Sequence, residues 1–216
     1  YVPIDISASV LDFLQEDLMR EFPRLKLRIQ PGEYQTALSK VREQTGAVPR
    51  VLLFLGGNVG NFTYPQARDF YQKLAETAQP GDLLISGLDL KKDPRVILQA
   101  YDDDQGVTAA FNLNLLTRIN RELEANFQLE NWQHFPSYDP QTGECRSYLV
   151  SRCEQFVKIG ALKEEYHFRP AEAIQTEVSR KYDLAEIESL AQSAGWQVQE
   201  HLRDSRNYYV DTVWVR

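Results

Sequence analysis

A short apolar run that ends in two glycines constrains the fold of this chain more than any other feature. The run is Val51–Leu55, and Gly56 and Gly57 follow it at once. Continuous apolar runs of this length are typical of a strand buried on both faces of a parallel sheet. Glycine permits the sharp turn or close ligand approach that follows such a strand. Because open α/β sheets bind ligands beyond the carboxyl ends of their strands, we expect a small-molecule site here, with Asn61 as its first polar candidate.

Strands and helices alternate through the first 90 residues. Ser9 is the expected N-cap of the first helix, because a serine hydroxyl accepts a hydrogen bond from a free backbone N–H there. The strands are expected at 1–6, 25–29, 51–55 and 83–90, with helices at 9–21 and 63–78. Such alternation predicts a parallel sheet with right-handed crossovers.

The pattern changes after Pro94. A long helix at 108–126 and alternating segments follow, which predicts a helix with antiparallel strands. A helix and two strands at 183–194, 196–202 and 208–215 then close the sheet with an antiparallel edge. We therefore expect an α/β core formed by residues 1–94 and 182–216, with an α+β lobe at 95–181 inserted in it. The residues at the junction, Lys91 to Asp93, are expected to form a solvated loop.

Composition excludes several functional classes. The net charge of −7 argues against a nucleic-acid partner, and no apolar run approaches the roughly 20 residues of a membrane span. The two cysteines suggest free thiols in a reducing, cytoplasmic compartment. The three histidines make no metal-ligand spacing with a cysteine, so we expect no metal site. Composition leaves the oligomeric state open.

Four motifs carry a resemblance to a known family. They are residues 54–62 (FLGGNVGNF), 88–94 (LDLKKDP), 100–112 (AYDDDQGVTAAFN) and 176–182 (TEVSRKY). In this order they resemble the histidine-specific methyltransferases of ergothioneine biosynthesis, which use S-adenosylmethionine. The resemblance covers nearly the whole chain and implies a class I methyltransferase fold, Rossmann-like, with a substrate-binding lobe.

The resemblance also implies a segment before Tyr1. In the family that segment supplies part of the substrate domain, the first strand of the sheet and the glycine-rich turn under the cofactor. The first strand lies between the second and the fourth, so a chain without it would have a hole in its sheet, with unpaired backbone groups. We expect either a piece of a longer protein or strands that pair in a new way.

Three residues match the family's cofactor-binding positions. Asp5 ends the first expected strand, where an acceptor-only carboxylate suits the ribose hydroxyls. Glu33 and Tyr34 follow the next strand, where the family places an acidic–aromatic pair against adenine. The alternatives are a helix-terminal aspartate for Asp5, and a turn residue with a core aromatic for Glu33 and Tyr34.

Five residues match positions that bind the amino-acid substrate. Gly56 matches a small residue beside both ligands, Asn61 holds the α-amino end, and the hydroxyl of Tyr101 binds the carboxylate. Glu177 and Ser179 bind the imidazole, and their i, i+2 spacing puts both on one face of a strand. The alternatives are a helix cap for Asn61 and a solvent-facing pair for Glu177 and Ser179.

The implied reaction is transfer of methyl groups from S-adenosylmethionine to the α-amino group of histidine, giving the trimethyl betaine. No residue is assigned as a catalytic base. One alternative is a methyltransferase for another aromatic amino acid or amine, which would not need Glu177 with Ser179. The other is a non-catalytic fragment that lacks the cofactor loop.

Overall fold

The structure is a computed structural model that describes residues 1–46 and 48–216. The α-helices are α1 (Ala8–Glu21), α2 (Tyr34–Thr45), α3 (Tyr64–Thr77), α4 (Pro94–Tyr101), α5 (Val107–Glu122) and α6 (Leu184–Ser193). Short 3-10 helices are η1 (Asn58–Asn61), η2 (Leu129–Asn131) and η3 (Gly160–Leu162). The expected helices at 9–21, 63–78, 108–126 and 183–194 are confirmed, with ends shifted by a few residues.

In the part of the chain that the structure describes, the strands form four separate sheets. They are β1 (Ile4–Asp5), β2 (Gln30–Pro31), β3 (Val51–Phe54), β4 (Leu83–Asp89), β5 (Trp132–Asp139), β6 (Glu144–Ser151), β7 (Gln155–Ile159), β8 (Glu164–Phe168), β9 (Ala173–Arg180), β10 (Gln197–Arg203) and β11 (Tyr209–Val215). Their orders are β1-β2, β10-β11-β4-β3, β5-β6-β9 and β7-β8.

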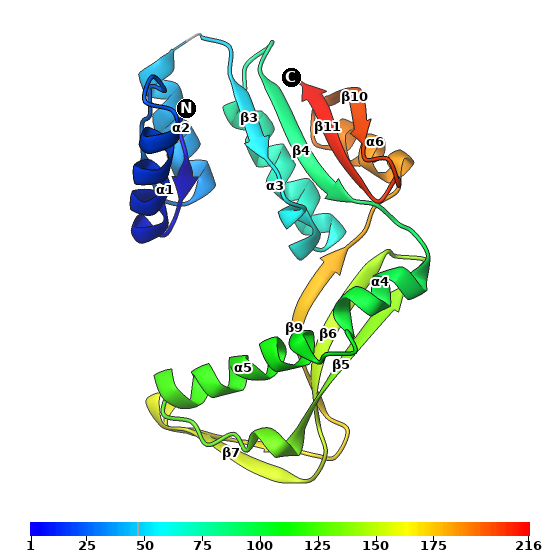
Figure 1. The fold of residues 1–216 in the computed structure, drawn as a ribbon. Coiled ribbons are helices and arrows are strands. Elements are labelled where there is room, and N and C mark those ends of the chain that lie inside the picture. The colour runs from blue at the N-terminus through cyan, green and yellow to red at the C-terminus, as the bar shows by residue number, and fades with distance from the viewer. Residues whose placement is uncertain (47) are drawn as a thin grey trace.

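The main hydrophobic core lies between the four-stranded sheet and the helices that pack against it. β3 and β4 are parallel, and β11 runs antiparallel to β4, which confirms the expected antiparallel edge. α3 and α6 pack against each other and cover one face of this sheet (Figure 1). Tyr71 and Trp214 are fully buried at the centre with ring centroids 4.6 Å apart, and the Tyr71 and Ser86 hydroxyls are 2.5 Å apart. These contacts join α3 to β4 and β11.

The N-terminal unit lies beside this sheet and does not extend it. β1 pairs in parallel with β2, and within the described residues β1 and β3 are not neighbours. Figure 1 shows α1 and α2 on the far side of the resulting gap. A cavity of about 410 Å³, lined mainly by apolar side chains of α1, α2, β1 and β3, occupies it.

The gap also corrects one expectation about β3. Val51 is 56% exposed and Leu53 53% exposed, so this strand is not buried on both faces. Its other edge is paired with β4, where Leu84 is fully buried. An apolar run predicts that a strand forms, but its side chains are buried only where other elements pack against them.

Three local expectations were wrong. No strand forms at 25–29, because pairing with the N-terminal segment yields only Gln30–Pro31 as a strand. The N-cap of α1 is Ser7, whose hydroxyl accepts from the backbone N–H of Val10, while Ser9 lies inside the helix. The junction after β4 is not a solvated loop, because both of its lysines form ion pairs and Asp93 caps α4.

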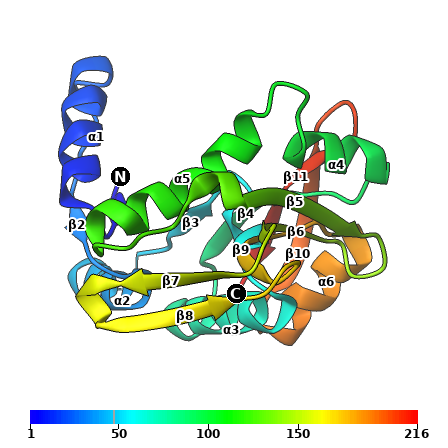
Figure 2. The same ribbon diagram turned by 90° about the horizontal axis from the view of Figure 1, so that it is seen from below.

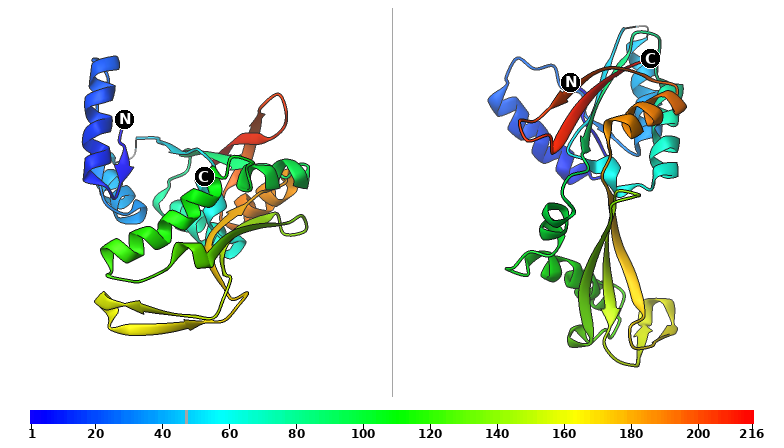
Figure 3. Two further views of the ribbon diagram at one scale, coloured as in Figure 1. Left: turned by 60° about the horizontal axis from the view of Figure 1, so that its bottom comes forward. Right: turned by 90° about the vertical axis from the view of Figure 1, so that its right-hand side faces the viewer.

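The second part of the chain builds a sheet of its own. β6 pairs antiparallel with β5 and β9, and the β7–β8 hairpin extends beyond it (Figure 2). α5 covers this sheet, and Leu116, Trp132 and Leu149 are buried between them. Two crossings, after β4 and after β9, connect it to the four-stranded sheet (Figure 3). Within residues 1–46 and 48–216, no helix is long and apolar enough to cross a membrane.

A buried ion pair at the start of β3 tests the account of the core. Asp82 accepts from the backbone and guanidinium of Arg50, and both side chains are at most 10% exposed. Removing one partner of a buried pair typically costs about 3–5 kcal/mol. We therefore predict a loss of this size for Asp82→Ala in chemical denaturation. Asp69→Ala is the control, because its pair with Lys73 is exposed and worth less than about 1 kcal/mol.

The same pair predicts a pH dependence. Burial alone would raise the pKa of Asp82, but the hydrogen bonds from Arg50 and Gln79 outweigh burial and hold this pKa below its ordinary value. A carboxyl with a lowered folded-state pKa stabilises the protein above its unfolded pKa and loses this contribution as the pH falls through the folded pKa. The deficit of Asp82→Ala should therefore shrink below about pH 4. A deficit that is constant from pH 7 to pH 3 would contradict this assignment.

Candidate active site

Glu177 and Ser179 lie on one face of β9, as the period of a strand requires. In the antiparallel ladder Glu177 is opposite Ser147, and Ser179 is opposite Cys145. Opposite residues point to the same side of a sheet, so these four side chains share a face. Ser147 and Cys145 are buried, whereas Glu177 is partly exposed. Burial raises the pKa of Cys145 to about 11, so it remains a thiol. Among these four side chains, Glu177 therefore provides the carboxylate, and Ser147, Ser179 and Cys145 are neutral.

The 3-10 helix η1 approaches β9 closely because Gly60 has no side chain. A Cβ at Gly60 would lie 3.0 Å from the carbonyl oxygen of Arg180 and 3.4 Å from Oγ of Ser179. Asn61 is the last residue of η1. The close approach therefore brings the segment that carries Asn61 against the strand that carries Ser179.

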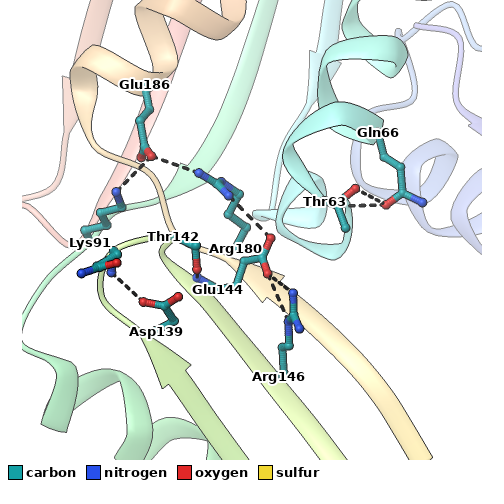
Figure 4. A network of polar contacts seen from close by, with 10 residues as sticks. Thr63, Gln66, Lys91, Asp139, Thr142, Glu144, Arg146, Arg180 and Glu186 are labelled. Carbon is teal, nitrogen blue, oxygen red and sulfur yellow. Dashed lines mark hydrogen bonds and ion pairs between the residues drawn. The ribbon is translucent and has the colours of Figure 1, made fainter.

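The helix cap near Asn61 is formed by a different residue. Thr63 is the N-cap of α3, and its backbone N–H and hydroxyl both donate to Oε1 of Gln66, at 2.9 and 2.8 Å (Figure 4). The cap interpretation of Asn61 is therefore wrong. Its amide is not committed to the start of α3.

Gly56 forms the turn after β3 with a φ of +80°, a conformation that favours glycine. Its N–H donates to the hydroxyl of Tyr209, 3.0 Å away on β11. Gly87 on β4 makes room for this tyrosine, because a Cβ there would overlap the phenol oxygen. We did not anticipate Tyr209 from the sequence, since 153 residues separate it from Gly56.

A buried lysine connects two of the expected site residues. Nζ of Lys181 donates to Oη of Tyr101 and to Oγ of Ser179, both at 2.8 Å. It also lies 3.0 Å from Oδ2 of Asp89, and its side chain is 5% exposed. Burial alone would lower the pKa of Lys181, but the interactions with Tyr101 and Asp89 outweigh burial and raise it. The ammonium is therefore charged and holds α4, β9 and β4 together.

The opposite face of β9 carries a chain of charged side chains (Figure 4). Arg180 lies 3.0 Å from Glu186 of α6 and 3.6 Å from Glu144 of β6. Glu186 also binds Lys91 at 3.0 Å, and Glu144 binds Arg146. These contacts attach β9 to α6, which packs on the four-stranded sheet, and to β6 of the three-stranded sheet. They thereby orient the face of β9 that carries Glu177 and Ser179.

Two of the three expected cofactor residues line the cavity between β1 and β3. Asp5 and Tyr34 line it, and Glu33 immediately precedes α2. Oδ1 of Asp5 also accepts from the backbone N–H of Ser7 at 2.8 Å, so Asp5 has the helix-terminal role of its alternative interpretation too. The ring of Tyr34 packs edge-on against Phe54 and Phe70, with centroids 5.9 and 6.0 Å away. Tyr34 therefore has the packing role that its alternative interpretation gave it, with 44% of its surface still exposed.

The expected residues thus fall into two groups. Tyr101 and Ser179 are joined through Lys181, Glu177 shares the face of Ser179, and the segment of Asn61 lies against the same strand. Asp5 and Tyr34 lie at a cavity whose lining includes no residue of β9. The motif at 176–182, which contains Lys181, was recognised from the sequence, but the role of this lysine was not. The i+2 spacing from Ser179 was the available signal.

Comparison with known proteins identifies the family. The family model described as "Histidine-specific methyltransferase, SAM-dependent" matches residues 1–216. The chain is 37% identical over 182 residues to the histidine N-alpha-methyltransferase of Mycolicibacterium smegmatis, and 36% over 182 residues to that of Mycobacterium tuberculosis. Each match covers 84% of this chain and 56% of the relative. An L-tryptophan methyltransferase of Psilocybe serbica is 30% identical over 151 residues, or 68% of this chain and 42% of that protein.

The chain thus spans about 56% of the length of the mycobacterial relatives. The family match confirms the expected class I methyltransferase fold, and the mixed sheet with its antiparallel edge agrees with it. The chain belongs to the family of histidine-specific, S-adenosylmethionine-dependent methyltransferases.

Proposed function

We propose that the native protein transfers methyl groups from S-adenosylmethionine to the α-amino group of histidine and forms the trimethyl betaine used in ergothioneine biosynthesis. The observation that carries this proposal is the shared face of Glu177 and Ser179, with Tyr101 linked to Ser179 through Lys181. Histidine N-alpha-methyltransferases at 36–37% identity support it. We place the enzyme in the cytoplasm, in line with its two free thiols.

In this proposal the cofactor and the substrate are bound mainly by different parts of the chain. Residues 1–94 and 182–216 form the core that holds the cofactor, and 95–181 form the lobe that holds most of the substrate. The separate sheet of β5, β6 and β9 supports this division. The imidazole-binding residues Glu177 and Ser179 lie at the end of β9 that leads into the crossing to the core.

The residues around the cavity fit the nucleoside end of S-adenosylmethionine. Asp5 is the last residue of a parallel strand, and its carboxylate can accept from two ribose hydroxyls, while the partly exposed side chain of Tyr34 is accessible to adenine. Glu33 is the acidic partner of Tyr34. When bound, this cofactor would supply an electrophilic methyl group.

The substrate residues bind and orient histidine. Glu177 accepts from the ring N–H, and Ser179 donates to the other ring nitrogen. Asn61 and Tyr101 hold the amino and carboxylate ends, and Gly56 leaves room beside them. Such positioning converts a bimolecular encounter into an oriented reaction.

The nucleophile is the neutral α-amine. The reference pKa of an α-amino group is about 8 and is somewhat higher in a zwitterionic amino acid, so the free amine is a minor but accessible species near neutral pH. The proposal therefore assigns no side chain as a strong base. What the chain contributes is orientation and specificity.

Replacing Glu177 tests whether this residue binds the imidazole. Glu177→Ala removes a charge-assisted hydrogen bond, typically worth about 1.5–3 kcal/mol, so histidine affinity should fall roughly tenfold to hundredfold. Ser179→Ala should cost less, since a neutral hydrogen bond contributes about 1 kcal/mol. Titration calorimetry with L-histidine in the native protein measures both, and binding of S-adenosylhomocysteine should not change.

The ratio of histidine to tryptophan turnover separates histidine from the other aromatic substrates. It should fall in Glu177→Ala, because tryptophan does not use that carboxylate. Tyr101→Phe is the matched control and should weaken both substrates alike, because it addresses their common carboxylate. A Glu177→Ala variant with the wild-type ratio would favour an N-methyltransferase with a different amino-acid substrate.

Asp5→Asn tests the cofactor site. The amide keeps one acceptor oxygen for the start of α1 but loses the charge offered to the ribose, so affinity for S-adenosylhomocysteine should fall roughly tenfold or more. Asp12→Asn on the exposed face of α1 is the control and should bind as the wild type does. Equal affinities for Asp5→Asn and the control would remove Asp5 from the cofactor site.

A further inference from the structure

Lys181 uses all the hydrogen-bonding capacity of its ammonium group. Such a group has three hydrogens, and three oxygens surround Nζ: Oη of Tyr101, Oγ of Ser179 and Oδ2 of Asp89, at 2.8, 2.8 and 3.0 Å. The side chain is 5% exposed, so water hardly competes for these positions. The ammonium is held on three sides by three different elements.

This arrangement sets the direction of two hydroxyl groups. An ammonium only donates, so both hydroxyl oxygens must accept from it. Their own hydrogens then point away from Lys181 and are left to donate to another group. Tyr101 and Ser179 thereby become donors, and each needs an acceptor from whatever binds beside them.

The surrounding charges favour a particular ligand. Asp89 is shared between Lys181 and Lys92, so it compensates the local positive charge only in part. Glu177 is the carboxylate on the same face of β9. A ligand that places a carboxylate near Tyr101 and a ring N–H near Glu177 matches this pattern of charge.

We propose that Lys181 is a positioning residue that keeps Tyr101 and Ser179 as hydrogen-bond donors, so that the site selects an amino acid whose ring carries an unprotonated nitrogen. This inference rests on the proposed function, because it takes both hydroxyls to face the substrate. A neutral imidazole satisfies Ser179 with its bare nitrogen and Glu177 with its N–H. An indole has only the N–H, so the hydrogen of Ser179 is left without an acceptor, which penalises binding.

A double-mutant cycle tests the proposal in the native protein. Histidine affinity is measured by calorimetry, with S-adenosylhomocysteine present, for the wild type, Lys181→Met, Tyr101→Phe/Ser179→Ala, and the triple variant. Lys181→Met should weaken histidine roughly tenfold to hundredfold in the wild-type background. It should cost less than about threefold once both hydroxyls are absent, because it acts through them. Losses that simply add would overturn the proposal.

The ratio of histidine to tryptophan affinity distinguishes a positioning role of Lys181 from a purely structural one. Lys181→Met should weaken histidine more than tryptophan, whereas a general distortion weakens both equally. Lys181→Gln keeps two N–H donors without the charge and should lose less histidine affinity than Lys181→Met. It also serves where the methionine variant does not fold. A loss of histidine affinity in Lys181→Gln that is matched by an equal loss of tryptophan affinity would then contradict the proposal.

Lys158→Met is the matched control, because this lysine lies on β7 with an exposed partner and should bind histidine normally. Melting temperatures report the fold of each variant. A wild-type protein that does not bind histidine contradicts the proposed function, and this inference with it. Histidine binding that Lys181→Met leaves unchanged contradicts the inference alone.

Discussion

The path of the chain from Glu177 to Tyr182 is the constraint on which the site depends. Side chains alternate along this extended segment, so Glu177, Ser179 and Lys181 face one way and Arg180 faces the other. Beyond β9 the backbone pairs with the end of β4, where the N–H of Tyr182 donates to the carbonyl oxygen of Asp89 at 3.0 Å. One segment thus belongs to the lobe sheet and is anchored to the core sheet.

The two faces of this segment have different tasks. Arg180 forms ion pairs with α6 and β6, which resist rotation of the strand about its axis. On the other face, Lys181 joins α4, β9 and β4. The ion pairs of Arg180 on one face of β9 fix the strand, so that Glu177 and Ser179 on the other face stay oriented toward a ligand. The result is a site whose geometry follows from the alternation of a single strand.

The break between β1 and β3 shows the opposite situation. β1 pairs in parallel with β2, and β3 with β4, but a cavity of about 410 Å³ lies between β1 and β3. Val51 and Leu53 remain exposed as a consequence. An apolar strand is only as buried as its neighbours make it, so local sequence predicts the strand but not its environment.

The same distinction explains how much the sequence could predict. The shared face of Glu177 and Ser179 and the antiparallel edge of β10 and β11 follow from local periodicity, and both were anticipated. The roles of Lys181 and Tyr209 were not, because they depend on contacts with residues 80 and 153 positions away. A lysine within a charged motif ordinarily indicates a solvated side chain, and only the fold reveals the three oxygens around it.

A crystal structure of the native protein with bound L-histidine would test the central claim most directly. The account predicts one imidazole nitrogen within hydrogen-bond distance of the Glu177 carboxylate and the other within reach of the Ser179 hydroxyl. It also predicts the substrate carboxylate at Tyr101, with Lys181 still bound to both hydroxyls. An imidazole that lies away from β9, or a reversed amino acid with its carboxylate at Ser179, would contradict it.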